Sequence, residues 1–162
     1  MTNKILSLTI LIASMSISSI SHAGKVEVTW TAPEKYRDIR AGEENRKRFK
    51  ARTFNALEKH LAKLSMKLPQ EQLLKINVTD VDLAGDTLHG GIERIRIIKD
   101  IYFPRLKFTY QLLNKTDGKV ILAEEVNLKD MGFMQRGRLK YKNQSLSYEK
   151  VMLDNWFDKT FK

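Results

Sequence analysis

The chain contains no cysteine among its 162 residues. Disulfide bridges are therefore impossible, and so are zinc sites and thiol nucleophiles that need a cysteine side chain. The usual catalytic motifs are also missing, since there is no Gly-x-Ser-x-Gly elbow, Walker-type phosphate loop, dinucleotide fingerprint or His-Glu-x-x-His pair. The sequence thus favours a binding protein over an enzyme and indicates no cofactor.

The sequence also lacks a long hydrophobic run. Its apolar stretch at residues 5–13 follows Lys4 and is shorter than the ~20 residues of a membrane-spanning helix. A serine-rich segment then ends in Ser21-His22-Ala23, with small residues where signal peptidase requires them. We therefore expect residues 1–23 to be a signal peptide cleaved after Ala23, and residues 24–162 to form one periplasmic domain. With no cysteine, a lipid anchor through that residue is excluded.

Positive charge is abundant, because 29 Lys and Arg face 19 Asp and Glu and give a net charge of +10. Such a surface raises the local concentration of anions. In the periplasm these would be lipopolysaccharide phosphates, anionic lipid headgroups or peptidoglycan carboxylates, and an envelope protein is the other candidate partner. The compartment argues against nucleic acid, and the plain alternative is a charged face that only confers solubility. The candidate binding residues are Arg46, Lys47, Lys50, Arg136, Arg138, Lys140 and Lys142.

Hydrophobic periodicity predicts five strands and two helices in the order β-α-β-β-β-β-α. The strands are expected near residues 25–31, 73–81, 94–103, 105–114 and 120–128, and the helices near 43–68 and 146–161. This order indicates a single α+β domain, with a mainly antiparallel sheet of four to five strands and both helices on one face. In the strand at 105–114, polar residues alternate with an apolar set that is expected to face the core: Leu106, Phe108, Tyr110 and Leu112.

In the first helix, leucines recur at steps of three and four, and Glu43 and Glu44 are expected in the first turn, where the helix dipole favours acids. Pro69 is expected to end the helix. His60 lies beside the leucine stripe and is expected at the surface or its boundary.

In the last helix, Met152 and Trp156 are expected to pack inward, and Tyr148 and Phe157 are further candidates for this packing. The acidic residues of this helix are expected to face water; they are Glu149, Asp154 and Asp158.

Two local signals concern the strands. Pro104 interrupts the extended run at residues 94–103, which suits an edge strand or a bulge. An edge strand could pair with a neighbouring protein, so a structural scaffold that acts through edge-strand contacts is a further functional alternative. Asp117-Gly118 supplies the positive φ angle of a tight hairpin between residues 105–114 and 120–128.

The stretch DVDLAGDTLHGG, Asp80 to Gly91, combines three carboxylates, a histidine and three glycines. A calcium loop would need a bidentate Glu at its twelfth position, where Gly91 stands. Asp82, Asp86 and His89 could instead form a metal or acid–base site, because they offer oxygen and nitrogen ligands. The favoured interpretation is a strand end and a glycine-rich turn.

In that structural interpretation the carboxylates serve the fold. We expect Asp80 and Asp82 to pair with Arg94 or Arg96 of the following segment.

Several segments resemble the domain-of-unknown-function 3016 family of small exported proteins of Gram-negative bacteria. They are VEVTWTAPEKYRDIR, INVTDVDLAGD, RIRIIKDIYFPRLKFTYQL, LKDMGF and LSYEKVMLDNWF, and the likeness covers about residues 25 to 160. The resemblance implies an exported single domain, and it brings no activity and no catalytic residues.

Overall fold

The computed structural model describes residues 26–40, 42, 44–87, 95–135 and 140–162. The elements in these ranges are β1 (Val26–Trp30), the 3-10 helix η1 (Pro33–Lys35), α1 (Arg46–Ser65), β2 (Gln72–Asp82), β3 (Asp86–Thr87), β4 (Arg96–Ile97), β5 (Arg105–Asn114), β6 (Val120–Lys129) and α2 (Ser147–Phe161). The predicted signal peptide lies outside the described residues.

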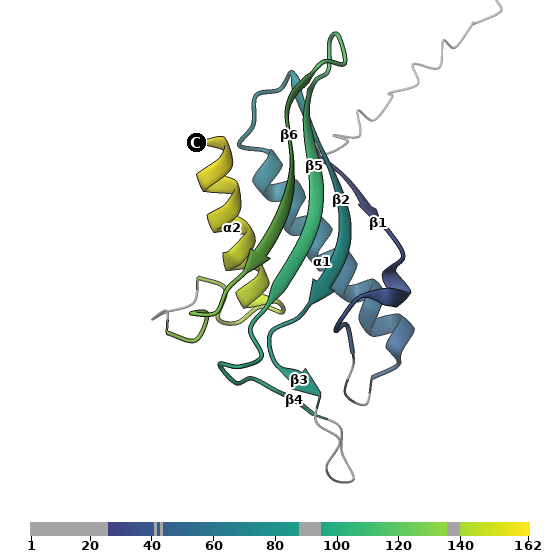
Figure 1. Cartoon of the computed structure of the whole chain (residues 1–162), viewed down its shortest axis with the longest axis vertical. Coiled ribbons are helices and arrows are strands. Elements are labelled where there is room, and N and C mark those ends of the chain that lie inside the picture. The colour runs from purple at the N-terminus through teal and green to yellow at the C-terminus, as the bar shows by residue number, and fades with distance from the viewer. Residues whose placement is uncertain (1–25, 41, 43, 88–94, 136–139) are drawn as a thin grey trace, which may run out of the picture.

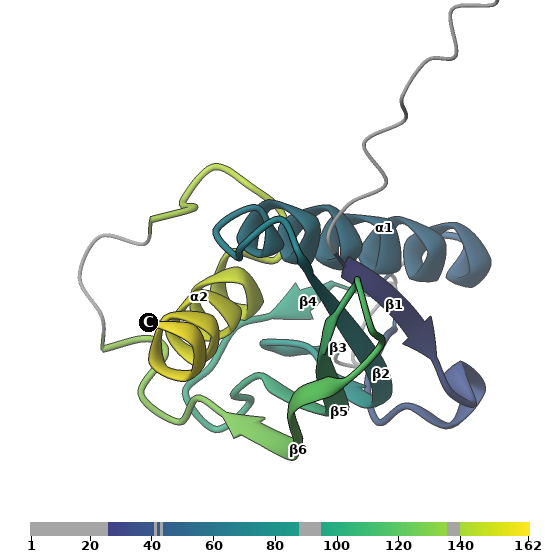
Figure 2. The ribbon, with the colours of Figure 1, turned by 90° about the horizontal axis from the view of Figure 1, so that it is seen from above.

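The main sheet has four strands in the order β1-β2-β5-β6, and β3 and β4 form a separate two-stranded ribbon (Figure 1). β1 runs parallel to β2, because α1 connects them as a crossover, while β2, β5 and β6 are antiparallel neighbours. Both helices cover the same face of this sheet (Figure 2). The predicted α+β class is therefore confirmed.

Alternation of buried and outward-facing side chains in β2 and β5 builds the core, with one irregularity in β2 between Val78 and Asp80. In β5, Leu106, Phe108, Tyr110 and Leu112 are buried beneath the helices, as predicted. The opposite face of the sheet carries polar residues such as Asn77, which pairs in register with Thr109. One face of the sheet is thus packed and the other is open to solvent.

The helices fix their position through aromatic contacts. Phe54 of α1 stacks on Trp30 of β1 with ring centroids 4.0 Å apart. Trp156 of α2 meets Phe108 and Tyr110 of β5 edge-on, at 4.8 and 5.4 Å. The predicted packing role of Trp156 is confirmed, since the residue is 7% exposed. No helix in the described ranges is long and apolar enough to cross a membrane.

The predicted start of the first helix is wrong. The helix begins at Arg46, and its cap is Asn45, whose side chain accepts hydrogen bonds from the backbone N–H groups of Lys47 and Arg48 at 3.0 and 3.2 Å. Glu44 precedes the cap and pairs with Arg52 at 2.7 Å, and Glu43 lies outside the described residues. An Asx cap therefore determined the boundary, and no acidic residue occupies the first turn.

The prediction of a strand near residues 94–103 is also wrong for most of the residues that the structure describes there, 95–103. Only Arg96–Ile97 pairs, with Asp86–Thr87 as its partner. Pro104 does not mark an edge strand, because it is buried directly before β5, a central strand. Since Pro104 stands outside the ladder, its missing N–H disturbs no strand pairing.

The hairpin between β5 and β6 is confirmed. Gly118 has a φ of +69°, and its N–H donates to the carbonyl oxygen of Asn114 at 2.9 Å. This hairpin forms one end of the molecule, at the top of Figure 1, and the β3–β4 ribbon lies at the other, which we call the lower end.

Candidate functional site

The segment from Tyr36 to Arg40 extends the sheet at the lower end. Its Asp38 forms a parallel bridge with Asp82, so the segment runs beside the last residues of β2. The Tyr36 hydroxyl donates to the carbonyl oxygen of Val78 at 2.7 Å and fixes the segment from inside. Burial raises the pKa of Tyr36 to about 12, so this donor keeps its proton. The segment therefore holds the exposed side chains of Arg37 and Arg40 in a defined place.

Asp82 and Asp86 line one hollow of about 240 Å³ at this end of the sheet. Its other lining residues are Arg37, Asp38, Arg40, Gly85, Ile101, Tyr102, Phe103 and Arg105. The structure thus brings together two of the three residues predicted as a metal or acid–base site. The third, His89, lies outside the described residues.

Arginines flank Asp82 in this hollow. Arg37 Nη1 and Arg105 Nε approach Asp82 Oδ2 at 3.8 and 3.7 Å. Burial nevertheless raises the pKa of Asp82, with the two arginines opposing that shift. Asp80 Oδ1 accepts the backbone N–H of Arg37 at 2.9 Å.

The predicted pairing of Asp80 or Asp82 with Arg96 is wrong. Arg96 instead binds Asp38 Oδ2 at 2.8 Å and donates to the carbonyl oxygen of Gly85 at 2.7 Å. Arg94, the other expected partner, lies outside the described residues. Arg96 therefore ties the β3–β4 ribbon to the segment before α1, a contact between distant parts of the chain that strand pattern alone could not give.

The acidic side chains here do not form a metal cage within the described part of the chain. In those ranges no three Asp, Glu or His residues converge so that they could hold a metal ion. Asp86 Oδ1 accepts the backbone N–H of the next residue, Thr87, at 2.7 Å, so this carboxylate is bound to the backbone.

A second hollow, of about 190 Å³, adjoins the first and is strongly basic. We call it the basic hollow. It shares Arg37 and Arg40 with the first hollow and is further lined by Arg46 and Lys50 of α1. The remaining lining residues are Pro33, Glu34, Tyr36 and Ile39. Four cations thus surround a small space that contains a single acidic side chain.

The start of α1 adds to this positive potential. Arg46, Lys47 and Arg48 occupy its first turn, and the N-terminal end of a helix already carries a partial positive charge. Cations there are destabilising, and within the described residues no carboxylate forms an ion pair with Arg46 or Lys50. An anion in the basic hollow would relieve both effects.

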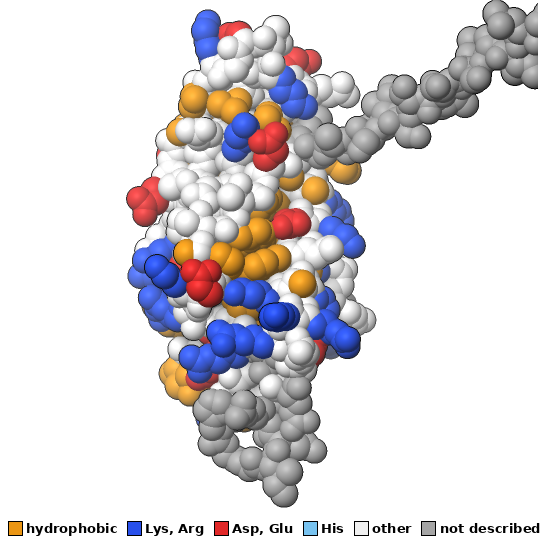
Figure 3. Space-filling view, turned by 90° about the vertical axis from the view of Figure 1, so that its right-hand side faces the viewer, with side chains coloured by type: hydrophobic (Ala, Val, Ile, Leu, Met, Phe, Trp, Pro, Cys, Tyr) orange, Lys and Arg blue, Asp and Glu red, His pale blue; other side chains and the backbone are white. Residues whose placement is uncertain are grey.

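The predicted binding residues are divided between two places. Arg46 and Lys50 line the basic hollow, and Lys47 is exposed beside them. Lys140 lies instead next to α2, where its Nζ binds Asp154 Oδ2 at 2.7 Å, and Lys142 is exposed in the same loop. Arg136 and Arg138 lie outside the described residues. Figure 3 shows Lys and Arg side chains gathered on the lower half of one side of the molecule.

A polar cluster joins the two helices, and the sequence predictions missed it; His60, Asp154 and Tyr141 are buried in it, while the Lys140 side chain is exposed. Asp154 Oδ1 binds His60 Nε2 at 2.8 Å, while Asp154 Oδ2 accepts hydrogen bonds from the Tyr141 hydroxyl and from Lys140 at 2.8 and 2.7 Å. We call these four residues the interhelical cluster. Burial lowers the pKa of His60, against the opposing carboxylate of Asp154. Burial alone would raise the pKa of Asp154, but the bonds from Lys140 and Tyr141 bring it below its usual range.

The expected exposure of these residues is therefore wrong. His60 is 5% exposed, Asp154 is 5% and Glu149 is 2%. Glu149 Oε1 accepts the backbone N–H of Ala84 at 2.7 Å and so ties α2 to the end of β2. Desolvation raises the pKa of Glu149, a shift that the bond from Ala84 opposes. One signal was available in the sequence, because Asp154 lies three residues before Phe157 and seven before Phe161, a spacing that places it on the same helix face as these aromatic residues.

Comparison with known proteins agrees with this single-domain organisation. No curated protein and no solved structure matched the chain. Residues 24–159 match the family described as protein of unknown function (DUF3016). The match covers all strands of the described residues, all of α1 and all but the last two residues of α2, including the basic hollow and the interhelical cluster, and the chain belongs to this family.

Proposed function

We propose that the protein is an exported, non-enzymatic binding domain that recognises phosphate groups of the cell envelope through the basic hollow. The observation that carries this proposal is the convergence of Arg37, Arg40, Arg46 and Lys50 on one small space. Guanidinium groups bind phosphate through paired charge-assisted hydrogen bonds, and lysine adds a point charge. A volume of about 190 Å³ suits a single headgroup rather than a larger ligand.

Local energetics support the same proposal. Arg46 and Lys50 stand near the positive end of the α1 dipole, where cations disfavour the helix. A bound phosphate would offset that repulsion, and it would also accept hydrogen bonds from Arg37 and Arg40. Binding would therefore be linked to a more stable helix start.

The partner follows from the predicted compartment. After cleavage at Ala23 the domain would enter the periplasm, where phosphates occur on lipopolysaccharide and on anionic phospholipids. Lipopolysaccharide carries phosphate monoesters and phospholipids carry phosphodiesters, and arginine and lysine can bind the anionic oxygens of both. An acidic envelope protein is the remaining alternative partner.

A hydrolase acting through Asp82 and Asp86 is a second candidate, favoured by one observation. Both carboxylates line the same hollow, and burial raises the pKa of Asp82, as is common for general acids. If this site used a metal, a chelator such as EDTA would lower the melting temperature of the unaltered protein and not that of Asp82→Asn.

The test of the binding proposal compares two double variants of equal charge change. Arg46→Gln/Lys50→Gln removes two cations from the basic hollow, whereas Lys115→Gln/Lys119→Gln removes two exposed cations at the opposite end, beside the hairpin turn. Binding to purified lipopolysaccharide, and to its dephosphorylated form, is measured by titration calorimetry at several salt concentrations.

We expect the unaltered protein to bind lipopolysaccharide, with an affinity that falls steeply with salt and with removal of phosphate. The first variant should bind about tenfold or more weakly, since each basic residue near an anionic surface contributes about 1 kcal/mol. The hairpin variant should bind nearly as well as the unaltered protein. If both variants lost affinity equally, the interaction would depend on net charge alone and not on the basic hollow. An affinity that does not change with salt concentration would also contradict the proposal.

A further inference from the structure

Large hydrophobic side chains are unusually exposed at the lower end of the molecule. In the described ranges, five of the eight exposed large hydrophobic residues belong to two short segments there: Ile95, Ile98, Ile101, Met131 and Met134. Contiguous exposed apolar side chains commonly mark interaction surfaces.

The first segment is a turn that presents an isoleucine at its tip. The Tyr102 N–H donates to the carbonyl oxygen of Lys99 at 3.0 Å, and Asp100 Oδ1 accepts the N–H of Ile101 at 2.9 Å. The Gly85 N–H in turn donates to the carbonyl oxygen of Tyr102 at 2.8 Å and fixes the turn to the sheet. Ile101 is nevertheless 65% exposed.

The second segment follows β6 and presents two methionines. Phe133 anchors it, since this ring is 1% exposed and meets Tyr148 edge-on at 4.7 Å. Met131 and Met134, on either side of the anchor, are 69% and 48% exposed. A buried aromatic residue thus holds a turn whose flanking apolar side chains remain in solvent.

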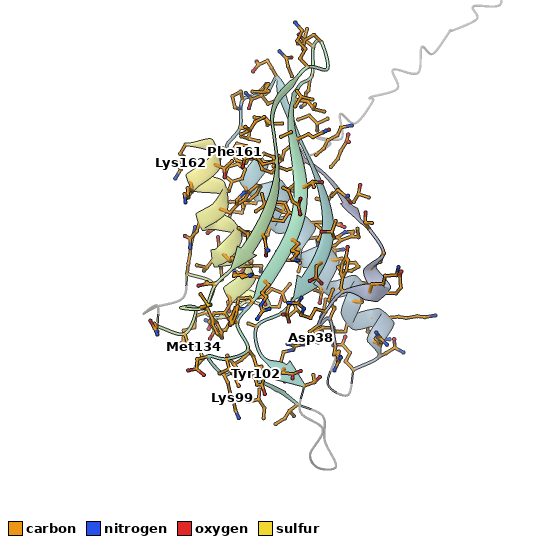
Figure 4. The ribbon with its side chains drawn as sticks, viewed as in Figure 1. Asp38, Lys99, Tyr102, Met134, Phe161 and Lys162 are labelled. Atoms are coloured by element: carbon orange, nitrogen blue, oxygen red, sulfur yellow. The ribbon has the colours of Figure 1, made fainter. Side chains whose placement is uncertain are left out.

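The two turns lie side by side. The Asp130 N–H donates to the carbonyl oxygen of Pro104 at 3.2 Å, and Arg105 is paired in register with Lys129. Figure 4 shows Lys99, Tyr102 and Met134 at the lower end, away from Phe161 and Lys162 at the end of α2.

Cations surround these apolar tips. Lys99 and Lys129 are exposed beside them, and Ile101 lines the same hollow as Arg37 and Arg40. Those two arginines also line the basic hollow, so the apolar tips and the proposed phosphate site form one continuous surface. Among the described residues, Asp100 and Glu34 are exposed carboxylates within it.

We propose that the turns 99–102 and 130–135 dock on an anionic lipid bilayer, with Ile101, Met131 and Met134 entering the headgroup region. The proposal rests on the proposed function and identifies the source of the phosphate groups as the lipid surface itself. Single apolar tips on separate turns fit the boundary between headgroups and acyl chains, while the surrounding cations meet lipid phosphates. A negatively charged protein partner would instead be expected to fill a groove on this surface.

The experiment uses the triple variant Ile101→Ser/Met131→Ser/Met134→Ser and, as a control at the hairpin end, the double variant Val120→Ser/Ile121→Ser. Val120 and Ile121 are 53% and 51% exposed at the hairpin end, so the control also removes exposed apolar surface. Co-sedimentation is measured with vesicles of phosphatidylethanolamine and phosphatidylglycerol, and with phosphatidylcholine alone. The N-terminus of the purified protein is determined by mass spectrometry, because a retained apolar leader would bind lipid by itself.

We expect binding to the anionic vesicles only, about tenfold or more weaker in the triple variant and unchanged in the control. Retention of the triple variant on heparin, a water-soluble polyanion, should be unchanged, whereas Arg46→Gln/Lys50→Gln should elute at a lower salt concentration than the unaltered protein. Failure of the lipid proposal is thereby distinguished from failure of the phosphate site.

Equal vesicle binding by the triple variant and the unaltered protein would overturn the lipid proposal, as would no vesicle binding at all. A concentration-dependent dimer that the triple variant abolishes would assign the two turns to protein contact instead.

Discussion

The interhelical cluster and the basic hollow use similar side chains in opposite ways. In the cluster, the 8% exposed side chain of Asp154 binds His60, Tyr141 and Lys140. In the basic hollow, Arg46 and Lys50 have no carboxylate partner among the described residues. The cluster is a closed region, because the carboxylate of Asp154 is buried and has its hydrogen-bond partners within the protein. The basic hollow is an open region, because its cations face solvent.

This difference separates structure from binding. A buried carboxylate must be paired, because leaving it alone in the interior is strongly unfavourable. An exposed cation is solvated by water and needs no partner, so it remains available for one. The chemically richer cluster, with its aspartate, histidine and tyrosine, therefore fastens α1 to α2, while the simpler group of cations is the candidate site.

The largest effect should come from breaking the closed region. Asp154→Ala removes the shared acceptor and leaves His60 and the Tyr141 hydroxyl buried without it. We expect the free energy of unfolding to fall by about 3 kcal/mol, measured by urea denaturation. Binding to lipopolysaccharide by the fraction that remains folded should be unchanged.

Asp158→Ala is the control for that change. Asp158 also lies on α2, but its ion pairs with Lys67 and Lys162 are exposed, so its loss should affect stability far less. If Asp154→Ala and Asp158→Ala lowered the free energy of unfolding equally, the buried and the exposed carboxylate would not differ in their contribution to stability.

A smaller effect should appear as pH falls. Because burial lowers the pKa of His60, the unfolded chain binds a proton below about pH 6.5 before the native state does. The contribution of neutral, buried His60 to the free energy of unfolding is therefore fully present above about pH 6.5. It is lost as the pH falls toward the pKa of His60 in the native state. We expect the free energy of unfolding to decrease over this range.

His60→Gln provides the comparison, since an amide can still donate to Asp154 but does not titrate. The decrease below pH 6.5 should be smaller in this variant. If His60→Gln and the unaltered protein lost stability equally below about pH 6.5, burial would not be what keeps His60 neutral. At lower pH, protonation of Asp154 should weaken both proteins, because its pKa is depressed in the native state.

The smallest effect tests the open region. Without ligand, Arg46→Gln/Lys50→Gln should raise stability slightly, by about 0.5 kcal/mol, because it removes cations from the positive end of α1. Thermal unfolding at low salt measures it. A marked loss of stability would instead show that these cations serve the fold, and the basic hollow would then resemble the interhelical cluster.

Local pattern predicted the sheet well and the polar contacts poorly. Alternation identified the buried residues of β5, and Asp117-Gly118 located the hairpin, because both depend on neighbours in the sequence. The partner of Arg96 and the burial of Glu149 depend on residues 58 and 65 positions away. No periodicity within one element contains that information.

The candidate site was anticipated in part. The density of Arg and Lys near residue 46 indicated a basic surface, and two of its predicted members, Arg46 and Lys50, line the basic hollow. Arg37 and Arg40 were missed, because a polar connecting segment gives no sign that it will pair beside β2.

By itself the sequence determined the composition and the order of elements: no thiol chemistry, a net positive charge, and strands and helices whose apolar faces must be buried together. Hydrophobic periodicity and turn chemistry act between near neighbours, so they can be read directly. Only the tertiary structure decided which charged side chains are buried and paired and which remain exposed without a partner carboxylate in the described part of the chain. The crossing of α1 and α2 buries Asp154 with His60, whereas the end of β2 holds Arg37 beside Arg46 at the surface, and both outcomes arise from packing between distant segments.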